Sequence, residues 1–196
     1  MSSQYDMMDN TAWGKEVKQS MIKKAAEFAK RAHDGVYRKG TQIPYIPHPM
    51  ETAAIVTAFT NEPEMIAAAL LHDVIEDAGA TKEELEEKFG SRVAFLVESE
   101  SEDKSRSWME RKGTTVEHLK SATRDEKILA LADKLSNIRS TVRDYLVLGD
   151  EVWQRFNQKD KEMQGWYYKG VAEALKEFKG HIYYEEYLML CKKIFG

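Results

Sequence analysis

The chain has 196 residues, of which 42% are hydrophobic and 32% charged, and its formal net charge is −4. These proportions are typical of a globular protein and exclude a collagen-like, disordered or membrane-embedded chain. The negative charge also argues against a general nucleic-acid binder, which needs a basic face to neutralise phosphates. The first residues, MSSQYDMMDNTA, lack the apolar core of a secretory signal, and the single cysteine, Cys191, cannot form an intramolecular disulfide. We therefore expect a cytoplasmic protein with no membrane or nucleic-acid partner.

Apolar residues recur every three or four positions along most of the chain, and this spacing predicts helices. In the N-terminal half we expect a flexible N-terminus over 1–12, a helix over 13–33, a Pro-rich connector over 37–49, a helix over 50–59 opened by Pro49, a helix from Pro63 toward Glu76 with Asn61 as its cap, and a short helix from the capping box at 81–84 to Gly90.

In the C-terminal half we expect a helix over 93–97, a charged Ser-rich loop over 98–107, and helices over 108–120, 125–145, 161–178 and 183–194. Because no stretch sustains an alternation of period two, strands are limited to at most a short hairpin near residues 35–46. The sequence thus predicts an all-α helical bundle.

Acidic and histidine side chains gather at the end of the apolar run 65–71. His72 and Asp73 follow that run directly, and Glu76 and Asp77 come one helical turn later. Residues four apart share one face of a helix, so we expect these groups to lie together. Buried carboxylates need a partner such as a metal cation or water, although an exposed helix end, acidic by chance, has the same pattern.

Two further residues extend this group. His48 stands between Pro47 and Pro49, and Asp133 is the one carboxylate in the apolar run 128–135. With His72 and Asp73 they form a set of two imidazoles and two carboxylates. Mixed nitrogen and oxygen ligands suit Mn²⁺, Fe²⁺ or Zn²⁺, and four protein ligands leave room for water and substrate.

Four segments in order then resemble a known family. They read Arg38-Lys-Gly, Pro44-Tyr-Ile-Pro-His-Pro, Leu70-Leu-His-Asp-Val-Ile-Glu-Asp and Leu131-Ala-Asp-Lys-Leu-Ser-Asn-Ile-Arg. The chain resembles the HD-domain hydrolases of the RelA/SpoT type, which remove the 3′-pyrophosphate of the alarmone (p)ppGpp to give GDP or GTP. The resemblance covers roughly residues 25–140. Because the synthetase half of the bifunctional enzymes is absent, the chain looks like a stand-alone small alarmone hydrolase.

The resemblance implies a role for each matched residue. A metal, usually Mn²⁺, would be held by His48, His72, Asp73 and Asp133. Glu76 and Asp77 would activate and orient the attacking water. Arg38, Lys39, Asn137 and Ser140 would contact the nucleotide. It also implies one HD-type domain over residues 13–196, with core motifs in 25–140 and C-terminal helices in 141–196.

The acidic stretch 98–103 departs from the family pattern. Facing the pocket, it would repel a polyanionic substrate, but we expect a solvated loop. We also expect Lys104, Arg111 and Lys112 to be surface charges, and the aromatic segments 153–156 and 166–168 to pack in the core rather than wall a nucleotide pocket.

Three functions stay open on these residues. The first is the metal-dependent (p)ppGpp 3′-pyrophosphohydrolase. The second keeps the metal site but acts on another nucleotide, such as a nucleoside monophosphate or the 2′-phosphate of NADPH. The third is a non-catalytic sensor of metal or nucleotide, which the presence of every residue of the motif set argues against.

Overall fold

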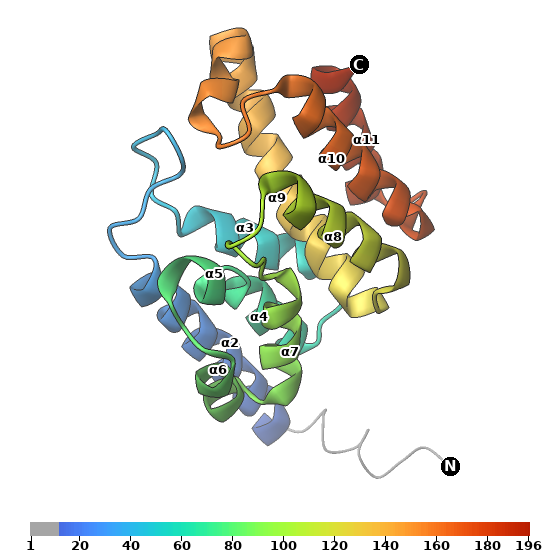
Figure 1. Cartoon of the computed structure of the whole chain (residues 1–196). Coiled ribbons are helices and arrows are strands. Elements are labelled where there is room, and N and C mark those ends of the chain that lie inside the picture. The colour runs from blue at the N-terminus through green and yellow to red at the C-terminus, as the bar shows by residue number, and fades with distance from the viewer. Residues whose placement is uncertain (1–11) are drawn as a thin grey trace.

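A computed structural model describes residues 12–196, and this part of the chain is all-α, as predicted (Figure 1). The expected hairpin is reduced to one isolated antiparallel bridge between Tyr37 and Pro44, and the described residues form no strand. The predicted flexible N-terminus falls on residues 1–11, outside the described residues, and on Ala12, which opens the first helix. Among the described helices, none has the length and apolar character needed to cross a bilayer.

The N-terminal part of the chain carries the first three of the motif segments, of which Arg38-Lys-Gly lies in the connector between two helices. Its helices are α2 (Ala12–Ala32), α3 (Pro47–Val56), α4 (Pro63–Leu71) and α5 (Val74–Ala78). Helix α3 begins earlier than expected, so that His48 lies inside its first turn. Helix α4 begins after Glu62, whose N–H is accepted by Thr60 Oγ1, and Asn61 is therefore not its cap.

The helix predicted to run from Pro63 toward Glu76 is in fact broken. Helix α4 ends at Leu71, and α5 begins at Val74 after Asp73, which has φ −99° and ψ −3°. His72 and Asp73 thus lie at a bend between two helices rather than on one continuous face.

The middle of the chain forms α6 (Lys82–Phe89), α7 (Ser91–Glu100), α8 (Trp108–Ser121) and α9 (Arg124–Leu148). Side-chain caps explain where three of them start: Thr81 caps α6, and capping boxes formed by Ser107 with Glu110 and by Thr123 with Glu126 open α8 and α9. Helix α7 reaches Glu100, so the first half of the acidic stretch is helical rather than loop.

The C-terminal part forms the 3₁₀ helices η1 (Gly149–Arg155) and η2 (Lys176–Phe178) and the helices α10 (Lys161–Ala174) and α11 (Ile182–Phe195). The long helix α9 runs through the centre of the molecule, where it contacts α3, α4, α7 and α11 (Figure 1). Its buried residues, among them Leu131, Leu135 and Ile138, form the middle of the core. Asp133 and Ser136, on the same helix, are also buried, so α9 carries polar groups into the interior.

Candidate active site

Four side chains from three segments meet in the interior. His48 comes from α3, His72 and Asp73 from the bend after α4, and Asp133 from α9. His48 Nε2 lies 3.1 Å from Asp133 Oδ1 and 3.4 Å from Asp73 Oδ2, and the corresponding distances from His72 Nε2 are 3.4 and 3.0 Å. His48, His72 and Asp133 form a group whose ligand atoms all lie within 4.8 Å of one another, and Asp73 approaches both rings.

These separations fit one metal ion. Ligand atoms about 2.1 Å from an ion lie about 3.0 Å apart at octahedral angles and about 3.4 Å apart at tetrahedral angles. The observed distances of 3.0 to 3.4 Å span this range.

The protons of the two imidazoles support the same interpretation. His72 Nδ1 lies 2.8 Å from the Ala69 carbonyl, which can only accept, so Nδ1 carries the proton. His48 Nδ1 lies 2.8 Å from Ser136 Oγ, whose own proton is donated to Glu51, so this Nδ1 also donates. In the neutral rings both Nε2 atoms therefore present lone pairs to each other, 3.2 Å apart. Two lone pairs and two carboxylate oxygens around one point need positive charge between them, which a metal ion or a proton on one Nε2 supplies.

The electrostatics of the group are consistent with this need. Burial alone would lower the pKa of His72, but the Asp73 and Asp133 carboxylates outweigh burial and hold that pKa well above its usual value. The carboxylates have partners of their own: Tyr45 donates to Asp73 Oδ2 at 2.7 Å, and Asn137 Nδ2 donates to Asp133 Oδ1 at 2.6 Å. These contacts leave both carboxylates directed at the imidazoles.

A cavity of about 580 Å³ opens over this group. Its lining includes the six residues to which the resemblance assigned catalytic or nucleotide contacts, namely Arg38, Lys39, Glu76, Asp77, Asn137 and Ser140. Burial and the neighbouring Asp77 raise the pKa of Glu76. Lys104 is an exposed surface charge, as expected, and its Nζ also donates to Asp77 Oδ1 at 2.9 Å and to the Glu76 carbonyl at 2.6 Å, which tethers the acidic pair.

One end of the cavity is basic. Arg38 Nη2 donates to Asn137 Oδ1 at 2.8 Å, and Lys39 Nζ donates to Asn157 Oδ1 at 2.7 Å. Arg155, at the end of η1, also lines this end and pairs with Asp144 at 2.7 Å. Its stem packs so closely on Gly40 that a Cβ there would lie 2.6 Å from it. Arg155 and Asn157 were missed in the sequence because they follow the matched motifs.

At the other end of the cavity, the acidic stretch 98–103 is not the solvated loop that we expected. Glu100 and Glu102 both line the cavity, and their side chains are only 7% and 10% exposed. Glu102 accepts from Lys112 at 2.7 Å and from Arg111 at 2.8 Å. Arg111 and Lys112 are therefore part-buried wall residues, not surface charges.

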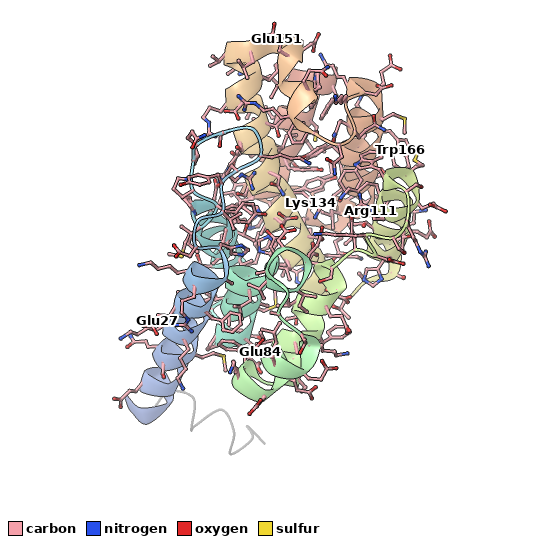
Figure 2. The ribbon with its side chains drawn as sticks, turned by 60° about the vertical axis from the view of Figure 1, so that its left-hand side comes forward. Glu27, Glu84, Arg111, Lys134, Glu151 and Trp166 are labelled. Atoms are coloured by element: carbon pink, nitrogen blue, oxygen red, sulfur yellow. The ribbon has the colours of Figure 1, made fainter. Side chains whose placement is uncertain are left out.

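Lys134 completes this end of the cavity. It contacts Asp133 directly and lies 3.4 Å from Glu100 Oε2. Figure 2 shows Lys134 on α9 in the middle of the molecule, with Arg111 on the neighbouring α8. Burial and Lys134 lower the pKa of Lys112, and burial raises the pKa of Glu100. The acidic segment thus faces the site, and its carboxylates are paired with the basic residues there.

The aromatic segments serve the core and the cavity together. Trp153, Tyr167 and Tyr168 are buried, as expected, but Trp166 is exposed. Tyr167, Tyr168 and Phe156 also line the cavity. The expectation treated core packing and pocket wall as alternatives, whereas Tyr167 and Tyr168 do both.

The HD domain family profile matches residues 25–159, and the chain belongs to this family. The match includes all four residues of the buried His–Asp group and ends between η1 and α10.

Individual proteins that the chain resembles have more specific descriptions than the family. The chain is 35% identical over 164 residues to guanosine-3′,5′-bis(diphosphate) 3′-pyrophosphohydrolase MESH1 of Xenopus tropicalis, which covers 82% of this chain and 86% of that protein. It is also similar to a solved structure described as a metazoan ortholog of SpoT that hydrolyzes ppGpp, with a TM-score of 0.74 and 26% identity over 88% of this chain and 94% of that one. The crystal structure of lmo0812 from Listeria monocytogenes matches with a TM-score of 0.70 and 34% identity, over 76% and 98% of the two chains.

Proposed function

We propose that this protein is a metal-dependent hydrolase that removes the 3′-pyrophosphate of ppGpp, releasing GDP and pyrophosphate. The observation that carries the proposal is the convergence of two imidazole lone pairs and two carboxylates at the base of a cavity with a basic end. The 3′-pyrophosphohydrolase activity for which the MESH1 relative is named supports the choice of substrate.

In this proposal His48, His72, Asp73 and Asp133 hold the ion, for which Mn²⁺ is our first choice and Fe²⁺ or Zn²⁺ the alternatives. A divalent ion at this point supplies Lewis acidity and positive charge for the pyrophosphate. Asn137 and Tyr45 keep the two carboxylates oriented through the hydrogen bonds described above.

The chain's own groups then move the protons. Glu76 and Asp77 orient a water molecule, and Glu76 takes its proton as the water oxygen bonds to the phosphorus next to the ribose. The bond between that phosphorus and the 3′-oxygen breaks, and the 3′-oxygen takes up the proton that Glu76 accepted from the water. Burial and Asp77 raise the pKa of Glu76, which makes this carboxylate a stronger base than an ordinary glutamate.

The basic end of the cavity would hold the 5′-phosphates. Arg38, Lys39 and Arg155 outnumber Asp144, the acidic residue paired there, so this end keeps a positive excess. Asn137 and Ser140 lie between it and the metal group, on the face of α9 that lines the cavity.

One observation favours a second substrate. Glu100 and Glu102 offset the positive charge of Lys134, Arg111 and Lys112 on the cavity wall, and this weakens the attraction for a substrate with many phosphate charges at that end. A nucleotide with a single phosphate there, such as a nucleoside monophosphate or NADPH, is therefore the alternative.

We also propose that residues 13–196 act as one domain, because α10 and the segment after η1 supply the cavity wall that the matched motifs lack. The test is an activity panel of the purified protein with Mn²⁺ against ppGpp, nucleoside monophosphates and NADPH. Release of GDP and pyrophosphate from ppGpp, abolished in His72→Ala, supports the proposal. If the protein hydrolyses NADPH or a monophosphate but not ppGpp, the choice of substrate is wrong, and only the assignment as a metal-dependent phosphohydrolase survives.

A further inference from the structure

Behind His48 lies a chain of charged and polar side chains to which the motif resemblance assigns no role. His48 Nδ1 lies 2.8 Å from Ser136 Oγ, Ser136 Oγ donates to Glu51 Oε2 at 2.7 Å, and Arg139 Nη1 donates to Glu51 Oε1 at 2.9 Å. Arg139 in turn makes two hydrogen bonds to the carboxylate of Glu186, at 2.7 and 2.5 Å. We call the chain Ser136–Glu51–Arg139–Glu186 the His48 relay.

The helical spacing explains how the His48 relay forms. His48 and Glu51 lie three residues apart on α3, and Asp133, Ser136 and Arg139 follow one another at intervals of three on α9. Residues at this spacing share one face of a helix, and α3 packs against α9. The two faces therefore match residue against residue, from Asp133 beside His48 to Arg139 beside Glu51.

Each donor in the His48 relay has a fixed direction. The Glu51 carboxylate can only accept, so the one proton of the Ser136 hydroxyl points to Glu51. Toward His48 the hydroxyl can then only accept, which fixes the imidazole proton on Nδ1 and leaves Nε2 free for a cation. The two metal histidines differ here, because His72 Nδ1 is held by the main-chain carbonyl of Ala69 and not by a side chain.

We propose that Ser136 and Glu51 are positioning residues that fix the tautomer and orientation of His48 and thereby tune metal affinity, with Arg139 and Glu186 holding Glu51 in place. A ligand histidine whose second nitrogen donates to a carboxylate-linked group is a stronger ligand, and loss of such a partner weakens metal binding by about 10–100-fold. The relay also connects the metal group to α11, which contributes Glu186. The inference rests on the metal centre of the proposed function.

The experiment measures Mn²⁺ affinity by calorimetric titration of the full chain, without substrate. Ser136→Ala is expected to weaken binding by about 10–100-fold. The matched control is Thr52→Val: Thr52 is buried on α3, the helix of His48, and its hydroxyl donates to the His48 main-chain carbonyl at 3.1 Å rather than to the ring. It is expected to leave Mn²⁺ affinity within about twofold of the wild type, since the tautomer of His48 does not depend on it.

A second pair of variants guards against misfolding of Ser136→Ala. The Glu51 side chain is 40% exposed, so its replacement is tolerated by the fold. Glu51→Ala removes the acceptor for Ser136, whereas Glu51→Gln keeps an acceptor oxygen, so the glutamine should restore most of the affinity that the alanine loses. Equal Mn²⁺ affinity in wild type, Ser136→Ala and Glu51→Ala would overturn the positioning role. If the wild type neither binds Mn²⁺ nor hydrolyses ppGpp, both the relay and the proposed function are overturned. If it hydrolyses ppGpp without binding Mn²⁺, the hydrolase activity stands, and only the metal centre and the relay are overturned.

Discussion

Removing the buried carboxylate of Glu100 should strengthen capture of a polyanionic substrate. Glu100 lies 3.4 Å from Lys134 Nζ on the wall of the cavity. A phosphate that contacts the lysine from the cavity side meets the repulsion of this carboxylate. We therefore expect Glu100→Gln to lower KM for ppGpp with little change in kcat.

The size of the effect follows from the geometry. A phosphate oxygen about 2.8 Å beyond Nζ lies about 6 Å from the Glu100 oxygen. Two unit charges at that distance repel by about 2.8 kcal/mol at an effective dielectric constant of about 20. At an ionic strength of about 0.1 M, screening leaves about half of this, or about 1.5 kcal/mol, which corresponds to about a tenfold lower KM. At about 1 M salt the residual effect is about twofold or less.

The assay is the salt dependence of kcat/KM, measured near pH 8 because burial raises the pKa of Glu100. Glu98→Gln is the matched control: it removes the same charge from the same helix, but Glu98 is 48% exposed and pairs with Lys82 away from the cavity. As the pH falls and Glu100 takes up a proton, the difference between wild type and Glu100→Gln should shrink. An equal gain in both variants, or a higher KM in Glu100→Gln that salt does not change, would refute the reasoning.

Three other predictions concern the same cavity. His72→Ala should lose bound Mn²⁺ by elemental analysis, whereas Glu76→Gln should keep it and lose about 10²–10⁴ in kcat; metal-free Glu76→Gln would make Glu76 a ligand. Because burial and Asp77 raise the pKa of Glu76, kcat/KM should fall with decreasing pH at a midpoint above the ordinary glutamate value, and Asp77→Asn should move that midpoint downward; an unmoved midpoint excludes this coupling. Arg155→Gln should raise KM for ppGpp about tenfold with kcat unchanged, and an unchanged KM would remove Arg155 from the substrate contacts.

Helical periodicity was sufficient to predict most of the fold. The expected helix over 125–145 is α9, and the helix over 108–120 is α8, each within a few residues of its observed ends. Both begin at capping boxes, which are local signals. The 3₁₀ helix η1 was missed, because it follows Gly149 with no apolar period of its own.

The bend at His72 and Asp73 could not be read from spacing. On a continuous helix adjacent residues point about 100° apart, so two neighbours cannot both reach one point. The bend removes that limit and brings His72 Nε2 to 3.0 Å from Asp73 Oδ2. His72 and Asp73 must converge because they share one site with His48 and Asp133. Those two residues are distant in sequence, so local spacing gives no sign of the bend.

The acidic segment shows why charge patterns need their partners to be interpreted. In isolation, the run from Glu98 to Asp103 is typical of a solvated loop, since like charges repel and attract water. Yet Lys134 lies within the apolar run 128–135, where the helical period predicts burial, and a buried ammonium group needs a carboxylate. Asp133, its neighbour, contacts Lys134 through Oδ2 but also faces the imidazoles through Oδ1, so a second acidic partner from another segment helps to balance the buried ammonium group. Glu100 supplies it, and the segment that departs from the family pattern is therefore placed where it adjusts the charge of the cavity.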